Sequence, residues 1–105
     1  LIESKKRLYK LYRDAFQNIS KLKLLQEPKG CSSNYWLQTL ILEESVIDQL
    51  DSVLEHTNAN GLMTRPVWKL LNSLTPYRNC PCAPLLVAKS LEYRIVNLPS
   101  SAGLV

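Results

Sequence analysis

The first stretch of the chain carries apolar residues at helical spacing and predicts one helix over residues 3–19. The stripe comprises Leu8, Leu11, Tyr12, Ala15, Phe16 and Ile19. A short strand over residues 22–25 follows. Pro28 and Gly30 stop this strand because both residues interrupt regular structure.

The segment 35–42, YWLQTLIL, is rich in aromatic and β-branched residues. This composition predicts a strand that is largely buried on both faces. We therefore expect Leu37, Leu40 and Leu42 to be strongly buried, and Trp36 to lie in or beside the core.

Two further helices are predicted downstream. Ser45, with Asp48 three residues later, is typical of the N-terminal cap of a helix. The apolar face of that helix comprises Val46, Ile47, Leu50, Val53 and Leu54. Gly61 is expected to end it in the left-handed conformation. Pro84 suits the first position of the last helix.

Short strands over 62–65 and 95–98, with helical turns over 68–74 between them, complete the order α-β-β-α-β-α-β. This order predicts the α+β class, with a small, mainly antiparallel sheet of three to four strands flanked by helices. The length of 105 residues suits a single domain over residues 1–105.

The net charge is +4, and the positive charge is concentrated in the first quarter of the chain. There the lysines and arginines alternate with acidic and core-type residues. A solvated helix face explains this pattern, so no nucleic-acid partner is expected. No apolar run approaches the ~20 residues that span a membrane, and the first residues do not resemble a secretory signal. We expect a cytoplasmic protein without membrane contact. A start without Met, within a helical pattern, suggests an excised fragment.

The three cysteines, Cys31, Cys80 and Cys82, are an odd number, which favours a reducing compartment. Cys80 and Cys82 form a C-x-C pair, and His56 is the only histidine. Too few ligands are therefore present for a zinc site, and no metal is expected.

The sequence offers no self-contained active site, because it has neither a glycine-rich phosphate loop nor a G-x-S-x-G motif. Three polar-aromatic clusters nevertheless stand where an element meets a loop, the usual place for binding residues. They are the segments 32–36 (SSNYW), 64–68 (TRPVW) and 97–101 (NLPSS). Arg65 and Trp68 together suit a phosphate and a flat ring. The alternative interpretation places Trp36 and Trp68 in the core and leaves Arg65 as a surface charge.

In this order and spacing, the clusters resemble the C-terminal part of the DegT/DnrJ/StrS family, pyridoxal-phosphate-dependent aminotransferases that act on keto-sugar nucleotides. The matching pieces are the helix around Lys6-Arg7-Leu8-Tyr9, then SSNYWLQTLIL, NANGLMTRPVWKLLNSL and PYRNCPCAPLLVAKSLEYRIVNLPSSAGL. The subgroup that the chain most resembles is the perosamine-synthetase-like enzymes of legionaminic-acid and related surface-sugar pathways.

The resemblance implies that the chain is the C-terminal small domain of a larger enzyme and closes one wall of its substrate cleft. The parent enzyme would use pyridoxal phosphate to move an amino group, commonly from glutamate, to a keto-sugar nucleotide, and would be a homodimer. In this family the large domain carries the Schiff-base lysine, and no part of this sequence matches that domain. We therefore assign no catalytic or cofactor-binding residue, and expect the chain alone to be inactive and free of cofactor.

Four residues are candidates for substrate binding: Asn34, Arg65, Trp68 and Tyr77. Asn34 opens the predicted strand, Pro66 stiffens the chain at Arg65, and Trp68 offers a flat apolar surface. The other interpretation makes Arg65 a helix cap or a surface ion-pair partner and Trp68 a core residue. Two other functions stay open: a non-catalytic α+β interaction module that uses the basic first helix, and, less favoured, a nucleic-acid-binding domain.

Overall fold

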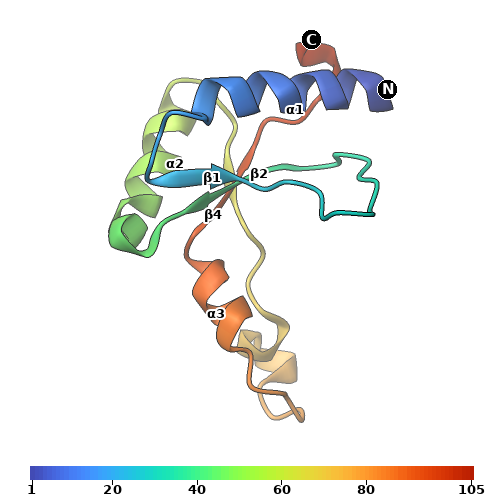
Figure 1. Cartoon of the computed structure of the whole chain (residues 1–105). Helices are drawn as coiled ribbons and strands as arrows, with labels where there is room; N and C mark the ends of the chain where they lie inside the picture. Colours follow the sequence, from blue (N-terminus) through green and yellow to red (C-terminus); the bar gives the residue numbers. More distant parts are fainter.

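A four-stranded sheet forms the middle of the computed structural model, which describes all of residues 1–105 (Figure 1). The strands are β1 (Leu22–Leu24), β2 (Gln38–Leu42), β3 (Arg65–Pro66) and β4 (Ile95–Leu98). Their order is β1-β2-β4-β3, and each neighbouring pair is antiparallel. The predicted α+β fold with a small antiparallel sheet is confirmed.

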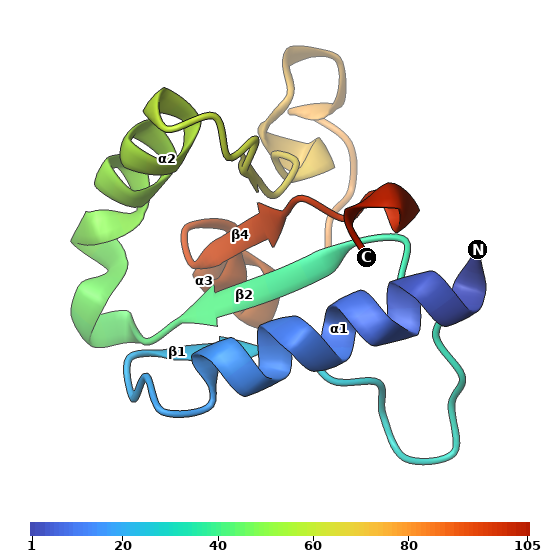
Figure 2. The same cartoon turned by 90° about the horizontal axis from the view of Figure 1, so that it is seen from above.

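Helix α1 (Ile2–Phe16) covers one face of this sheet (Figure 2). The register places Leu40 of β2 opposite both Leu24 of β1 and Val96 of β4, so these side chains share a face. The buried core on that face consists of Tyr9, Leu24, Leu40, Leu42, Leu50 and Val96. The predicted burial of Leu40 and Leu42 is confirmed, whereas Leu37 is only half-buried because it precedes β2. Burial in β2 alternates instead of continuing along both faces.

Helix α2 (Leu50–Ala59) does not begin at the predicted cap. A 3₁₀ helix over Glu44–Gln49 precedes it, and Glu43 stands in the cap position of that segment. Ser45 lies inside this 3₁₀ helix and not at its start, and its Oγ bonds the Lys21 Nζ at 3.3 Å and a Glu43 carboxylate oxygen at 3.4 Å. Gly61, with φ of 78°, takes the predicted left-handed conformation after α2.

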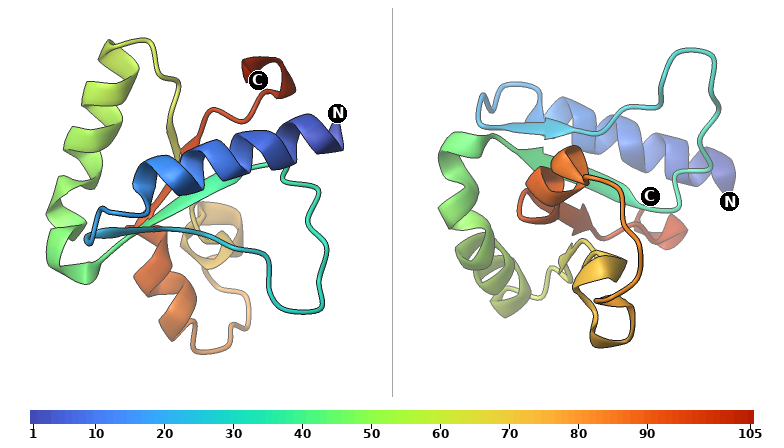
Figure 3. Two further views of the ribbon diagram at one scale, coloured as in Figure 1. Left: turned by 45° about the horizontal axis from the view of Figure 1, so that its top comes forward. Right: turned by 90° about the horizontal axis from the view of Figure 1, so that it is seen from below.

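Residues 67–93, here called the arm, extend from the sheet on the side away from α1 (Figures 1 and 3). The arm contains 3₁₀ turns over Leu71–Ser73 and Thr75–Tyr77 and helix α3 (Leu86–Glu92), and none of its residues is buried. Pro84 is not the first residue of α3, because Leu85 (φ −94°, ψ 51°) stands outside the helical region in the cap position. The radius of gyration, 15.3 Å, exceeds the roughly 13 Å of a compact domain of this length because the arm projects.

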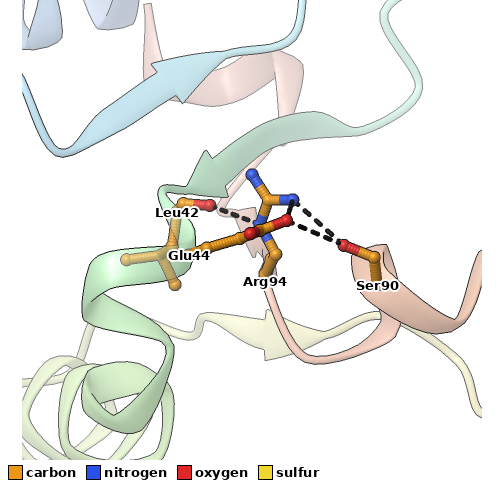
Figure 4. A network of polar contacts seen from close by, with 4 residues as sticks. All are labelled: Leu42, Glu44, Ser90 and Arg94. Carbon is orange, nitrogen blue, oxygen red and sulfur yellow. Dashed lines mark hydrogen bonds and ion pairs between the residues drawn. The ribbon is translucent and has the colours of Figure 1, made fainter. Parts of the chain in front are cut away.

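Arg94 ties the end of the arm back to the sheet (Figure 4). Its Nε donates to the Leu42 carbonyl oxygen at 2.8 Å, and its Nη1 lies 3.2 Å from a Glu44 carboxylate oxygen. The same Nη1 donates to the Ser90 Oγ of α3 at 3.1 Å. Arg94 thereby joins α3, the end of β2 and the following 3₁₀ helix at one point.

The two ends of the chain lie close together at the start of α1 (Figures 1 and 2). A last 3₁₀ turn, Ala102–Leu104, packs on α1. None of the helices combines the length and apolarity that crossing a membrane requires. These contacts fix the segment after β4 against α1, which matters for the site described next.

Candidate functional site

An open groove of about 560 Å³ lies at the edge of the sheet formed by β3. The end of β4, the residues around β3 and Leu37 surround it. Its lining includes Arg65, Trp68, Asn97 and Ser100, and it contains no acidic residue. The groove therefore combines one cation, a large aromatic ring and polar groups.

Arg65 is available to bind an anion. Its side chain is exposed, and it makes neither an ion pair nor a side-chain hydrogen bond. The structure thus shows no partner of the kind that a helix cap or a surface ion pair would supply. An unpaired guanidinium can donate two parallel hydrogen bonds to a phosphate or carboxylate.

Both tryptophans of the chain lie at the surface beside this groove. Trp36 is 66% exposed and Trp68 is 67% exposed. Their ring centroids are 6.3 Å apart and the ring planes make an angle of 33°. The prediction that Trp36 lies in or beside the core is wrong, and so is the alternative that Trp68 is a core residue. Together the two rings present one aromatic surface.

A left-handed turn before β2 explains why Trp36 points outward. Tyr35 has φ of 50°, and this conformation breaks the strand alternation that the sequence had suggested for residues 35–42. The turn is held by two local hydrogen bonds: the Tyr35 amide donates to the Ser33 Oγ at 2.9 Å, and the Trp36 amide donates to the Asn34 Oδ1 at 3.0 Å. The Tyr35 ring packs on Tyr9 at 4.8 Å, away from the groove.

Asn34 does not line the groove. Its side-chain oxygen is used within the turn, so the residue is placed to orient Trp36 rather than to reach across the groove. Of the four candidate residues, the structure brings Arg65 and Trp68 into the groove and leaves Asn34 beside Trp36.

Tyr77 lies elsewhere, in a cavity of about 460 Å³ within the arm. Cys80 and Cys82 line the same cavity, and both thiols are free and exposed. The Oδ1 of Asn72, which also lines this cavity, is buried without a hydrogen-bond partner. The structure therefore does not group Tyr77 with the other three candidates.

Asn97 is a groove residue that the sequence did not single out. It is buried in β4, opposite Arg65 in β3, and its Oδ1 accepts a hydrogen bond from the Thr39 Oγ1 at 2.9 Å. Only the segment 97–101 as a whole had signalled a possible site. The pairing with Arg65 follows from the strand register, which no local pattern reveals.

Three tyrosines have raised pKa values, all near α1 or the turn before β2. Burial raises the pKa of Tyr12. Burial also raises the pKa of Tyr9 and Tyr35, and in both cases the Glu27 carboxylate adds to the increase. These side chains stay neutral over the ordinary pH range, and none of them lines the groove, whose one charged residue is Arg65.

The basic residues of α1 are partly used inside the molecule. Lys6 pairs with Glu3 at 3.5 Å, and Arg13 pairs with Asp14 at 2.9 Å. The Lys5 Nζ donates to two backbone carbonyl oxygens. Arg7 and Lys10 of the same helix make no ion pair and no side-chain hydrogen bond, so the interaction module suggested as an alternative keeps two unpaired cations on α1.

Comparison with known proteins gives a consistent result across the whole chain. The sequence model of the DegT/DnrJ/EryC1/StrS aminotransferase family matches residues 1–105. A GDP-perosamine synthase of Caulobacter vibrioides is 30% identical over 70 residues, which are 67% of this chain and 19% of that protein. A GDP-perosamine synthase of Vibrio cholerae is 24% identical over 105 residues, 99% of this chain and 28% of that protein.

Solved structures share the same fold. PseC of Helicobacter pylori, an aminotransferase involved in the biosynthesis of pseudoaminic acid, superposes with a TM-score of 0.89 at 18% identity, over 100% of this chain and 29% of its own. A DegT DnrJ EryC1 StrS aminotransferase from Brucella abortus has a TM-score of 0.81 at 25% identity, over 99% of this chain and 27% of its own. The chain therefore spans less than a third of the length of each of these four proteins.

Proposed function

The chain belongs to the DegT/DnrJ/EryC1/StrS aminotransferase family, and from this premise we propose that it is the small C-terminal domain of a pyridoxal-phosphate-dependent enzyme that aminates a keto-sugar nucleotide. In this proposal residues 1–105 form one wall of the substrate cleft. The enzyme serves surface-polysaccharide synthesis in the cytoplasm, takes its amino group from glutamate and works as a homodimer.

The observation that carries the proposal is that Arg65, which has no ion-pair partner, and the exposed Trp68 line the same groove, which contains no acidic residue. A sugar nucleotide presents a diphosphate beside flat and apolar rings. Arg65 suits the diphosphate, because a guanidinium binds phosphate oxygens through two parallel hydrogen bonds. Trp68 suits the face of the base or of the sugar ring.

The neighbouring polar groups would complete the binding surface. Asn97 is held by Thr39 and lines the groove next to Arg65, and Ser100 lines it two residues after the end of β4. These groups orient a sugar nucleotide without any change in their own protonation. We assign them positioning and binding, and no proton transfer.

The residues of this groove do not fit pyridoxal phosphate. Enzymes of this kind carry that cofactor on a lysine, and no lysine lines the groove. We therefore derive no chemical step through the cofactor for these residues. The proposal gives this chain the recognition of the sugar nucleotide alone.

The relatives support a nucleotide-linked sugar as the ligand. The two curated relatives are GDP-perosamine synthases, and a solved structure of DesI in the presence of its TDP-sugar product has a TM-score of 0.87 to this chain at 24% identity, over 98% of this chain and 27% of its own. GDP is therefore the probe of choice for a first binding measurement.

The deciding experiment compares Arg65→Ala with Arg78→Ala in the full-length enzyme. Arg78 is also exposed but lies in the arm, outside the groove. Losing a charge-assisted hydrogen bond costs about 1.5–3 kcal/mol, so Arg65→Ala should raise the Kd for GDP and the KM for the sugar nucleotide about 10- to 150-fold. The half-reaction with the amino donor should stay almost unchanged, and Arg78→Ala should behave as the wild type. If both half-reactions fell together with the melting temperature, Arg65 would be structural and the proposal would fail.

A further inference from the structure

One side chain of α1 holds together two segments that border the groove. The Lys5 Nζ donates to the Ser100 carbonyl oxygen at 2.6 Å and to the Trp36 carbonyl oxygen at 3.2 Å. The Ser100 Oγ donates to the same Trp36 oxygen at 2.8 Å. Residues 5, 36 and 100 are far apart in sequence, so this bridge joins three separate segments of the fold.

The bridge contacts one residue that lines the groove and one whose ring lies beside the groove. Ser100 itself lines the groove. Trp36 does not, but its ring lies against Trp68, which does. Fixing the Trp36 backbone therefore limits where its indole can lie, and this indole in turn supports the indole of Trp68.

Helix α1 holds the same segment at a second point. The Tyr12 hydroxyl donates to the Pro99 carbonyl oxygen at 2.8 Å. Lys5 and Tyr12 are seven residues apart, so they lie on one face of the helix, two turns from each other. The Tyr12 contact fixes the segment after β4, whereas Lys5 and the Ser100 hydroxyl couple that segment to Trp36.

The geometry of the two rings says how they can serve a ligand. Their centroids are 6.3 Å apart, whereas a third ring sandwiched between them would need about 7 Å, or two contacts of about 3.5 Å. A ligand ring would therefore stack on the exposed surface of Trp68, with the tilted indole of Trp36 as a neighbouring support. The orientation of this support decides how well the ligand surface is preorganised.

We propose that Lys5 is a positioning residue of the groove: by binding the Trp36 and Ser100 carbonyl oxygens together, its ammonium group fixes the indole of Trp36 against Trp68. The consequence for ligand binding rests on the proposed function. The consequence for the two rings does not, because it follows from the hydrogen bonds alone.

The test uses a signature of the tryptophan pair, recorded in the full-length enzyme as the difference from Trp68→Phe, which removes one of the two tryptophans of this chain. Two indoles at this distance give a pair of coupled circular-dichroism bands of opposite sign, and Trp68→Phe should abolish it. Lys5→Met keeps the length of the side chain and removes its donors, and should lose most of this signal. Lys5→Arg keeps the donors and should restore it. Lys6→Met, whose residue only pairs with Glu3, is the matched control and should leave it intact.

GDP titration of the same variants in the full-length enzyme separates the two proposals. Lys5→Met should weaken GDP binding about three- to tenfold through lost preorganisation, and Lys5→Arg should recover most of it.

A wild-type enzyme that does not bind GDP would refute the proposed function, and the circular dichroism alone would then test the role of Lys5. An unchanged coupled signal in Lys5→Met overturns the inference, and so does a lost signal with unchanged GDP binding in an enzyme that binds it. If Lys5→Met does not fold, Lys5→Gln shortens the side chain so that it no longer reaches both carbonyl oxygens, and it should reduce the signal. An unchanged signal in that variant overturns the inference as well.

Discussion

Replacing Leu40 by alanine tests the core that holds β2 and β4 in place. Leu40 is 7% exposed and stands between Leu24 and Val96 in the register of β1, β2 and β4. The change removes three buried carbons, each worth about 0.8 kcal/mol, or about 2.4 kcal/mol in all. Neighbouring strands cannot close the cavity without breaking their ladders, which adds a further cost. We expect the free energy of unfolding to fall by about 2–5 kcal/mol.

Urea unfolding followed by far-ultraviolet circular dichroism measures this loss. The slope against urea should stay unchanged, so that the shift of the midpoint reports stability alone. Leu86→Ala is the control, because Leu86 is 77% exposed on α3 and its loss should cost less than about 0.5 kcal/mol. A loss well below about 1 kcal/mol for Leu40→Ala would refute the assignment of β2 as the central strand of the core.

Two further changes follow from local features. Burial raises the pKa of Tyr12 above the ordinary value of 10.0, because the folded protein favours the neutral phenol. The stability of the fold that depends on this neutral phenol is fully present below pH 10.0 and is lost as the pH rises through the raised pKa. Tyr12→Phe should therefore flatten the fall of the unfolding free energy at alkaline pH, and an unchanged pH profile in urea melts would contradict this cause. Gly61 has φ of 78° with open space around it, so Gly61→Ala should cost about 1 kcal/mol through backbone strain alone. Gly103→Ala, outside the left-handed region, should be nearly neutral, and equal effects of the two changes would refute this reasoning.

The strands could be predicted because each short apolar run is bounded by turn-forming residues. The runs around Leu24, Leu40 and Val96 all became strands of the core. The start of β2 could not be predicted, because it depends on a left-handed conformation at Tyr35. Nothing in a tyrosine favours that conformation; the hydrogen bonds of the turn and the packing on Tyr9 select it.

The candidate site was accessible to sequence reasoning only where its residues are neighbours in the chain. Arg65 and Trp68 are three residues apart, and Pro66 between them was a local signal of a rigid loop. Asn97 joins the site because it pairs with Arg65 across two strands. Lys5 joins it through contacts with segments more than thirty residues away in the sequence. The position of Tyr77 in a separate cavity could not be predicted for the same reason, because the path of the arm depends on long-range contacts such as those of Arg94.

The edge strand β3 explains why the groove exists at all. Its two residues, Arg65 and Pro66, pair with Asn97 and Val96. Proline has no amide hydrogen, so the ladder cannot continue beyond it, and the chain leaves the sheet towards the arm. Trp68 therefore lies outside the sheet and away from the core, whereas in a longer strand an apolar residue at this position could have packed in the core. The same proline that holds Arg65 at the sheet edge thus leaves Trp68 exposed beside it. Because neither side chain belongs to the core cluster, the surface that would bind a ligand is separate from the residues that hold the fold together.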